Sequence, residues 1–458
     1  MKKRIIHLLL APIMMVSIPA AASPAGEATV PLRKPLRLNR PAANIELHKL
    51  KTFHIGRSFF ELPWVPAPAS TSVRDGLGPL FNVNTCKGCH VKGGRGDAPQ
   101  GPGPLVDSSV IKLALGKSGD PIYGKQLQPR SIGLEQSGHG LSFVGEGKAS
   151  VQYENRIVLL ADGTKVELRR PKYYVTELRY GELDPKTAIS SRVGPTLIGL
   201  GLVEEIAEDD IRSREDVDDS DGDGISGKAN LVPDIAGGSS KLGRFGYKAS
   251  QPSILQQSAD AFRNDIGITS NIFPSETCAP KQLNCLETAR RTSKPDNIEI
   301  DDQILNAVAY YVKLLGVPEN RKMQPAEALR GSQLFNTAGC SACHVPSFTT
   351  RSDATLVEFS SLKIFPYSDF LLHDMGEGLA DGVTEHQAEG REWRSTPLWG
   401  IGLVERVNPR AAYLHDGRAR SIEEAILWHD GEAKQAFKAY SNFSKKERED
   451  LIKFIRSL

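Results

Sequence analysis

The chain is poor in cysteine and methionine, and it has no long apolar run after its first 22 residues. Six cysteines and five methionines occur in 458 residues, and three of the methionines fall within the first fifteen positions. Later apolar runs are shorter than the roughly 20 residues that cross a bilayer as a helix, so no membrane span is expected in the mature chain. The formal net charge of +2 falls by three, to −1, without Lys2, Lys3 and Arg4. Neither value indicates nucleic-acid binding.

The first 22 residues predict a secretory signal peptide. Three basic residues precede an apolar stretch from Ile5 to Pro19, and Ala20-Ala21-Ala22 offers an A-x-A cleavage site before Ser23. We therefore expect residues 1–22 to be removed and the mature chain to lie in the periplasm. An uncleaved N-terminal anchor is the alternative. No cysteine follows the cleavage site, which argues against a lipid anchor.

Four of the six cysteines belong to two C-x-x-C-H motifs, Cys86-Lys-Gly-Cys89-His90 and Cys340-Ser-Ala-Cys343-His344. In c-type haem attachment, the two thiols bond to the haem vinyl groups and the adjacent histidine reaches the iron. A zinc or redox C-x-x-C that happens to precede a histidine is the alternative. The pair predicts two covalently bound haem c groups, which fits export from the cytoplasm.

The remaining cysteines, Cys278 and Cys285, lie seven residues apart. In an oxidising compartment such a pair most simply forms a disulfide that closes a small loop, and two free thiols are the alternative. No catalytic role is assigned to either.

Length and motif spacing favour two haem modules. The mature chain exceeds one typical domain, and 254 positions separate Cys86 from Cys340. We expect an extended N-terminal arm at 23–75, an N-terminal haem c domain with insertions at 76–322, and a C-terminal cytochrome c domain at 323–458. The arm is rich in proline and alanine, and Pro63 to Pro68 is interpreted as an extended surface segment.

Each module is expected to close with an amphipathic helix. Apolar residues recur at helical spacing from Ile304 to Leu315, and a capping box at Ser444 precedes a second apolar face that ends at Leu458. Two runs around the turn signal Asp162-Gly163 predict a β-hairpin insertion. The expected fold is therefore mainly α, with two cytochrome c-like helical domains, the first enlarged by loop and β-hairpin insertions.

The second axial ligand of each iron decides what a haem can do, because an open iron binds small oxidants and a closed one only transfers electrons. Only Met323 and Met375 remain after signal removal, so histidine is the better candidate. The histidines of the expected mature chain outside the motifs are His48, His54, His139, His373, His386, His415 and His429.

His429 is the strongest of these candidates. Ser421 and Glu424 form a capping-box pattern that starts a short helix, and His429 follows the apolar run Ile426-Leu427-Trp428. A helix C-cap cation that faces solvent is the alternative for His429. His415 is the second choice, and it could instead brace the haem pocket by hydrogen bonding.

Several segments resemble the di-haem c-type oxidoreductase family, which is related to the bacterial di-haem cytochrome c peroxidases. They are Pro63 to Pro68, Asp75 to Asn82, Leu371 to Gly376, Trp393 to Trp399 and Ala425 to Gly431. In the related peroxidases a methionine or tyrosine after a helix with the pattern Leu-Glu-Glu-Ala-Val ligates the C-terminal haem. His429 stands at that position here, which implies a bis-histidine haem with His344.

The resemblance also implies two catalytic residues. The related peroxidases carry a tryptophan that bridges the haems and a glutamate that acts as the distal acid. At similar spacing this chain has Phe245-Gly-Tyr247-Lys-Ala249 and Asn264-Asp265-Ile-Gly267, so Tyr247 would be the bridge and Asp265 the acid. The alternatives are a core aromatic for Tyr247 and a helix-cap or loop carboxylate for Asp265.

An acidic loop gives a separate metal hint. Asp219, Asp221 and Asp223 alternate before Gly224, as in loops that bind Ca²⁺ through oxygen atoms, but Asn230 stands where a bidentate glutamate is expected. A solvated acidic turn is the alternative.

The leading functional prediction is a periplasmic peroxidase-like enzyme that passes electrons from a C-terminal bis-histidine haem to a reactive N-terminal haem. Its expected partners are a small redox donor of cytochrome or cupredoxin type and a small oxidant such as H2O2. A non-enzymatic di-haem electron carrier and an oxygenase or protein-modifying oxidase are the alternatives, because function lies in the distal pocket and not in the fold.

Overall fold

The structure, a computed structural model, describes residues 23–132, 145–292, 294 and 296–458. The expected signal peptide at 1–22 and His139 lie outside the described residues. Helices make up 30% of the chain and strands 19%. The strands form several small sheets of two or three members each. The expectation of a mainly α fold with two cytochrome c-like helical domains is therefore wrong.

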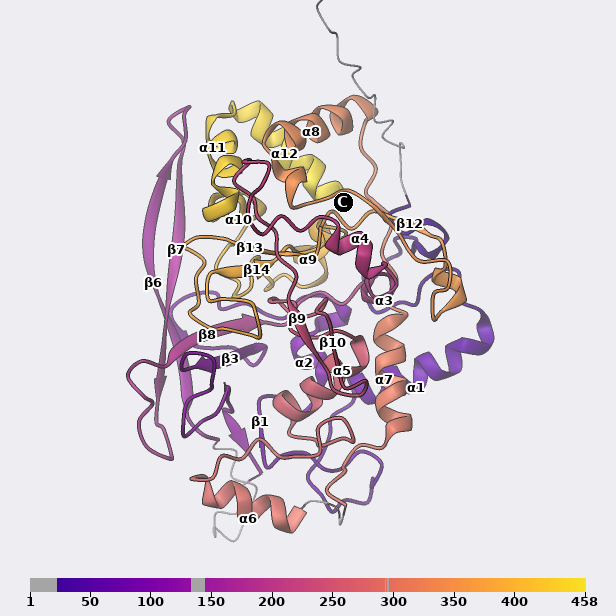
Figure 1. Cartoon of the computed structure of the whole chain (residues 1–458), viewed down its shortest axis with the longest axis vertical. Coiled ribbons are helices and arrows are strands. Elements are labelled where there is room, and N and C mark those ends of the chain that lie inside the picture. Colours follow the sequence, from indigo (N-terminus) through magenta and orange to yellow (C-terminus); the bar gives the residue numbers. More distant parts are fainter. Residues whose placement is uncertain (1–22, 133–144, 293, 295) are drawn as a thin grey trace, which may run out of the picture.

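The helices gather in two groups with β-strands between and beside them (Figure 1). In chain order the α-helices are α1 Leu50–Glu61, α2 Cys86–Cys89, α3 Leu200–Glu204, α4 Glu208–Arg212, α5 Ile254–Ala261, α6 Leu283–Thr292, α7 Asp302–Lys313, α8 Pro325–Thr337, α9 Val404–Val407, α10 Ile422–Leu427, α11 Lys434–Asn442 and α12 Lys445–Ser457. The helices α8, α11 and α12 lie at one end, while α1, α5 and α7 lie in the opposite half.

Most strands are short, which explains why sequence periodicity did not reveal them. They are β1 Leu80–Phe81, β2 Gly103–Pro104, β3 Ser109–Ala114, β4 Gln126–Leu127, β5 Arg130–Ser131, β6 Lys148–Leu159, β7 Lys165–Thr176, β8 Ala188–Val193, β9 Leu231–Asp234, β10 Ser239–Leu242, β11 Phe348–Thr349, β12 Lys363–Ile364, β13 Leu372–Asp374 and β14 Glu392–Arg394. The three-stranded sheets have the orders β2-β6-β7 and β4-β3-β8.

The predicted β-hairpin is confirmed and is longer than expected. Strands β6 and β7 pair antiparallel along their full length, from Lys148 opposite Thr176 to Leu159 opposite Lys165. Three hairpin side chains, Val158, Leu160 and Leu168, are buried in the apolar cluster that contains α12. The insertion in the first half of the chain thus packs on the second half.

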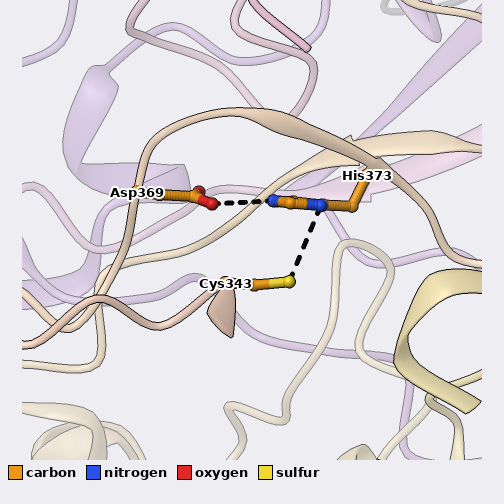
Figure 2. Close-up of side chains that lie close together, drawn as sticks. All are labelled: Cys343, Asp369 and His373. Atoms are coloured by element: carbon orange, nitrogen blue, oxygen red, sulfur yellow. Dashed lines mark hydrogen bonds and ion pairs between the residues drawn. The ribbon is translucent and has the colours of Figure 1, made fainter. Parts of the chain in front are cut away.

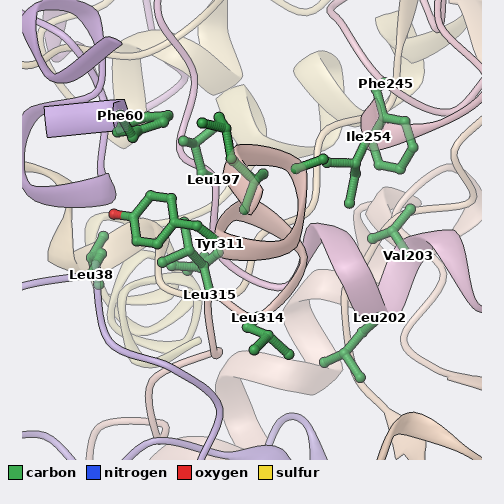
Figure 3. Close-up of a cluster of buried hydrophobic side chains, with 14 of the residues drawn as sticks. Leu38, Phe60, Leu197, Leu202, Val203, Phe245, Ile254, Tyr311, Leu314 and Leu315 are labelled. Carbon is green, nitrogen blue, oxygen red and sulfur yellow. The ribbon is translucent and has the colours of Figure 1, made fainter. Parts of the chain in front are cut away.

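The largest apolar cluster surrounds α7 (Figure 3). Leu305, Val308 and Tyr311 are buried on α7, and Phe60 from α1 packs against Tyr311 with ring centroids 5.1 Å apart. The same cluster includes Trp399 and Leu403 from the second half of the chain. The main core therefore extends across the expected boundary at residues 322 and 323, and the division into domains stays a prediction.

The expected extended arm at 23–75 is corrected by the structure. Its residues 50–61 form α1, and Phe53, Phe60 and Trp64 belong to the main core. Trp64 is 1% exposed, and its ring meets Phe262 edge-on at a centroid distance of 5.4 Å. Large apolar side chains stabilise the fold by roughly 1.5–3 kcal/mol each when they are buried, so Trp64 packs into the core although Pro63 to Pro68 is non-helical.

The closing helices and the disulfide follow the sequence predictions. Ser444 and Glu447 form both hydrogen bonds of a capping box at the start of α12, and Asp301 caps α7 by accepting from the Ile304 amide. Cys278 and Cys285 are joined by a disulfide with a Cα–Cα distance of 5.7 Å. None of the helices in the described ranges combines the length and apolar composition that crossing a bilayer requires.

A glycine in α1 permits the close contact between α1 and α7. A Cβ atom built on Gly56 would lie 1.9 Å from the carbonyl oxygen of Ala307, which is far inside van der Waals contact. We predict that Gly56→Ala lowers the free energy of unfolding by about 1–3 kcal/mol, because α1 must move away from α7. Urea denaturation followed by circular dichroism measures this loss.

Gly101→Ala is the matched control, since no atom lies within 4 Å of the position its Cβ would take. It should change the free energy of unfolding by less than about 0.5 kcal/mol. Equal effects of the two substitutions would show that the α1–α7 contact is not the limiting feature.

Candidate functional site

Both C-x-x-C-H motifs open onto one cavity of about 780 Å³. This volume lies in the upper part of the range for ligand pockets in proteins. The cavity wall includes all four motif cysteines, both motif histidines and His429, together with Tyr247 and Asp265. The residues predicted from the sequence as haem-binding or catalytic therefore share one internal space.

The first motif forms the short helix α2, and His90 ends it. His90 Nδ1 lies 2.8 Å from the carbonyl oxygen of Pro195. This hydrogen bond makes Nδ1 the protonated nitrogen and leaves Nε2 with a free lone pair, which is the form that binds a metal. Burial lowers the pKa of His90 to about 4, so the ring is neutral at physiological pH.

The second motif repeats the arrangement with different partners. His344 follows Cys340–Ala342, a 3-10 turn after α8, and its Nδ1 lies 2.9 Å from the carbonyl oxygen of Tyr367. Burial lowers the pKa of His344 to about 4 as well. No disulfide joins any of the four motif cysteines, which lie within the described residues. Burial raises the pKa of Cys86 and Cys340 to about 12.

His429 also uses Nδ1 for a backbone hydrogen bond. Ser421 caps α10 by accepting from the Glu424 amide, and His429 follows the helix with Nδ1 2.8 Å from the carbonyl oxygen of Ala425. The His429 ring is on the cavity wall. A positive charge on His429 would repel one on His344 and so lower the pKa of His344, which shows that the two rings are close. This placement near His344, away from bulk solvent, fits a histidine pair on one haem better than a solvent-facing helix cap.

Asp265 lies beside the first motif. It belongs to a single π-helical turn, Phe262–Ile266, that continues α5, and such turns occur frequently at functional sites. Gln126 Nε2 donates to Asp265 Oδ1 at 2.9 Å, and burial raises the pKa of the carboxyl group. The Asp265 charge in turn raises the pKa of Cys86 and Cys89, which places it close to both thiols.

Tyr247 lies in an aromatic group on the same cavity wall. Its hydroxyl donates to the carbonyl oxygen of Val193 at 2.8 Å. Its ring meets Trp393 and His415 edge-on, with centroid distances of 6.5 and 6.4 Å. His415 stacks on Trp393 at 3.8 Å and is buried, so it braces this group.

Sequence reasoning missed two features of the cavity. Trp393 was recognised only as part of a family segment, although it is the centre of the aromatic group. Asp260 is a second buried carboxyl on the wall near Asp265, and Asn264 Nδ2 donates to it at 2.8 Å. Asp260 and Asp265 are five positions apart, and residues at this spacing lie on the same side of a π-helical turn but not of a regular α-helix. The sequence alone does not reveal such a turn, so it could not indicate Asp260.

His373 is the centre of a charged cluster that the sequence did not predict (Figure 2). Its Nε2 lies 2.9 Å from Asp369 Oδ2 and its Nδ1 lies 2.7 Å from Glu432 Oε2. The hydrogen bonds to these carboxylates raise the pKa of His373 well above its usual value against the opposing effect of burial. Cys343 Sγ lies 3.6 Å from Nδ1. With both nitrogens engaged, His373 is a cation beside the second motif rather than an iron ligand.

The other predicted residues are scattered. His48, His54 and His386 are exposed and do not line the cavity. In the acidic loop, carboxylate oxygens of Asp216, Asp219 and Asp221 lie within 4.8 Å of one another, whereas Asp223 instead accepts from the Ile225 amide. Asp216 thus takes the place expected of Asp223, and calcium binding by this loop stays a prediction.

One comparison with known proteins supports a two-haem site in this chain. A family model described as "Di-haem oxidoreductase, putative peroxidase" matches residues 23–117 and 119–458. No curated protein matches the chain. Among solved structures, "Kuenenia stuttgartiensis Hydrazine Synthase Pressurized with 20 bar Xenon" is similar at 18% identity and a TM-score of 0.24. That match covers 40% of this chain and 63% of the other, less than two thirds of its length, and carries no argument about the site.

The arrangement of His344 and His429 generates a spectroscopic prediction. His429→Ala removes an imidazole whose Nε2 is free, so the C-terminal haem should lose its low-spin signal in electron paramagnetic resonance while iron content stays at two per chain. His386→Ala, which removes an exposed histidine, is the control and should leave the signal unchanged. An unaltered low-spin spectrum in His429→Ala would remove this residue from the ligand set.

Proposed function

This chain belongs to the di-haem oxidoreductase family, and we propose that it is a periplasmic enzyme of the peroxidase type. The proposal assigns electron entry to the end of the cavity at His344 and His429, and oxidant reduction to the end at His90. The single observation that carries it is the difference between these ends. One has a histidine, His429, beside the motif histidine, and the other has a buried carboxyl group, Asp265, beside the motif cysteines.

The residues present fit two haem groups. Three histidines donate Nδ1–H to backbone carbonyl groups and keep Nε2 unprotonated, and the two pairs of thiols lie on the same cavity wall. When bound, the haems would supply the iron for oxidant binding and the storage of electrons.

Asp265 would move the proton that peroxide reduction requires. H2O2 takes up two electrons and two protons to give two water molecules, and cleavage of the O–O bond is easier when a proton reaches the departing oxygen. Gln126 holds Oδ1 of Asp265, so Oδ2 would accept the proton and return it. Burial raises the pKa of this carboxyl group, which makes it a better base than an exposed aspartate.

Tyr247 would lie on the route between the two ends. Its ring contacts Trp393 and His415, and its backbone carbonyl accepts from the Arg394 amide at 2.9 Å, which fixes the loop against β14. A cytochrome or cupredoxin would supply the electrons. Such a donor would meet the enzyme in the periplasm, the location that we propose for it.

A stopped-flow measurement tests the function. The fully reduced protein should be reoxidised rapidly by H2O2, with a rate that rises linearly with peroxide concentration. Preincubation with cyanide should slow this reaction if the iron at the His90 end is open. The opposite result is protein that stays reduced in peroxide and has two low-spin irons whose spectra do not change on addition of cyanide. That result would identify an electron carrier.

A second prediction concerns Asp265. Asp265→Asn keeps the size of the side chain but cannot accept a proton, so peroxide turnover should fall by about 10²–10⁴-fold with haem content unchanged. In the native protein the rate should rise with pH as the carboxyl group ionises, and this rise should be absent in Asp265→Asn. Asp107→Asn is the control, because this exposed carboxylate pairs with Arg130 and does not line the cavity. Equal turnover in native protein and Asp265→Asn would exclude Asp265 from proton transfer.

A further inference from the structure

Two cations lie within cation–π distance of Trp393, which is in the middle of the aromatic group. Lys248 Nζ is 4.2 Å from the centroid of the indole ring, and Arg192 Cζ is 5.3 Å from it. A cation near the face of an aromatic ring stabilises the neutral ring through its quadrupole. The same cation repels the positive charge that the ring would carry after losing an electron.

Both cations are fixed where they are. Lys248 is fully buried, and its Nζ has three acceptors, which are the carbonyl oxygens of Glu389 and Glu392 at 2.7 and 2.8 Å and Asp381 Oδ1 at 3.3 Å. Three acceptors match the three N–H donors of an ammonium group. Arg192 is also buried and pairs with Asp381 at 3.0 Å and with Glu385. The carboxylates of Asp381 and Glu385 offset the desolvation cost of burying the two cations. The cations themselves contact the Trp393 ring.

The indole proton has no base to receive it. Trp393 Nε1 donates to the carbonyl oxygen of Leu379 at 3.0 Å, and a peptide carbonyl is a very weak proton acceptor. Loss of one electron from Trp393 would therefore leave a radical cation with the proton still on Nε1. Its positive charge would face both Lys248 and Arg192.

We propose that Lys248 and Arg192 keep Trp393 in its neutral, reduced form, so that electrons cross the aromatic group without oxidising this tryptophan. Lys248 is the principal positioning residue in this arrangement, because its charge lies nearest the ring. The inference deepens the proposed function, on which its biological role rests, but oxidation of Trp393 can be measured without peroxide. Trp399 also lines the cavity and has no cation–π contact within the described residues, so it is an unprotected comparison.

The test uses a one-electron oxidant generated by light. A laser flash in the presence of a ruthenium(II) polypyridyl complex and an external quencher gives ruthenium(III), which returns to ruthenium(II) by taking one electron from the protein. Samples of the oxidised, haem-loaded protein are frozen after the flash. Electron paramagnetic resonance then detects tryptophan radicals, which are recognised by ring-deuterated tryptophan.

Four proteins are compared: the native protein, Trp393→Phe, Lys248→Met, and Lys248→Met combined with Trp393→Phe. The native protein and Trp393→Phe should give the same radical signal. In Lys248→Met the radical signal that comes from Trp393 should be at least about tenfold larger than in the native protein. The reason is that the substitution removes a desolvated cation–π contact, which stabilises the neutral ring. The double variant should lack that increase.

Lys363→Met is the matched control, since Lys363 lies over Phe365 at 5.6 Å and not over a tryptophan. It should behave as the native protein. If Lys248→Met does not fold, Arg192→Met replaces it and should give a signal of the same kind. General unfolding would increase the radical signal of all four tryptophans, so much of the increase would remain in the double variant. Loss of protection at Trp393 alone would give an increase that the double variant lacks.

Two outcomes would overturn the inference. A native signal that falls on Trp393→Phe substitution would show that Trp393 is already oxidised, and this result requires no other variant. A Lys248→Met signal that does not depend on Trp393 would show that the lysine does not protect the ring. Failure of the peroxide reaction alone would reject the proposed function and leave this inference standing.

Discussion

The site depends on one repeated interaction, the hydrogen bond from a histidine Nδ1–H to a backbone carbonyl group. Pro195, Tyr367 and Ala425 supply the three carbonyl oxygens, at 2.8 to 2.9 Å. Each bond fixes the ring orientation and selects the tautomer in which Nε2 is free. The carbonyl groups come from segments distant from the motifs for His90 and His344, so the surrounding fold must form before either imidazole is oriented.

The sequence identified residues that line one cavity better than it predicted the architecture. The two motifs could be found because c-type haem attachment imposes a fixed local spacing. His429 was indicated by a helix-start pattern and by the family resemblance. The helices that end at Lys313 and Ser457 could be found from apolar periodicity and caps. The mainly α assignment failed because most of the strands have only two to six residues, which is too few to show a repeating pattern. The N-terminal arm was predicted to be extended and on the surface because it is rich in proline and alanine. The apolar residues of α1 were not recognised as a helix, and Trp64 is buried.

Other parts of the site depend on contacts that no local pattern encodes. His373 pairs with Glu432, 59 positions away, and Lys248 binds carbonyl groups more than 140 positions away. Asp260 and Asp265 face the same cavity because α5 ends in a π-helical turn, whereas a regular helix would rotate residues five positions apart to different sides. Resemblance to a family indicated Tyr247 and Asp265 only through residue spacing. Their placement on one wall required the folded chain.

Burial of the motif cysteines has a consequence for biosynthesis. A thiol reacts as its thiolate, and burial raises the pKa of Cys86 and Cys340 to about 12, so almost none of the reactive form exists in the folded chain. The cavity that the thiols line has wall residues from both halves of the sequence. The covalent haem attachment that the two motifs predict would therefore be favoured before the cavity forms, while the thiols are still in water and ionise more easily. In that order of events, bond formation at the cysteines would precede closure of the core.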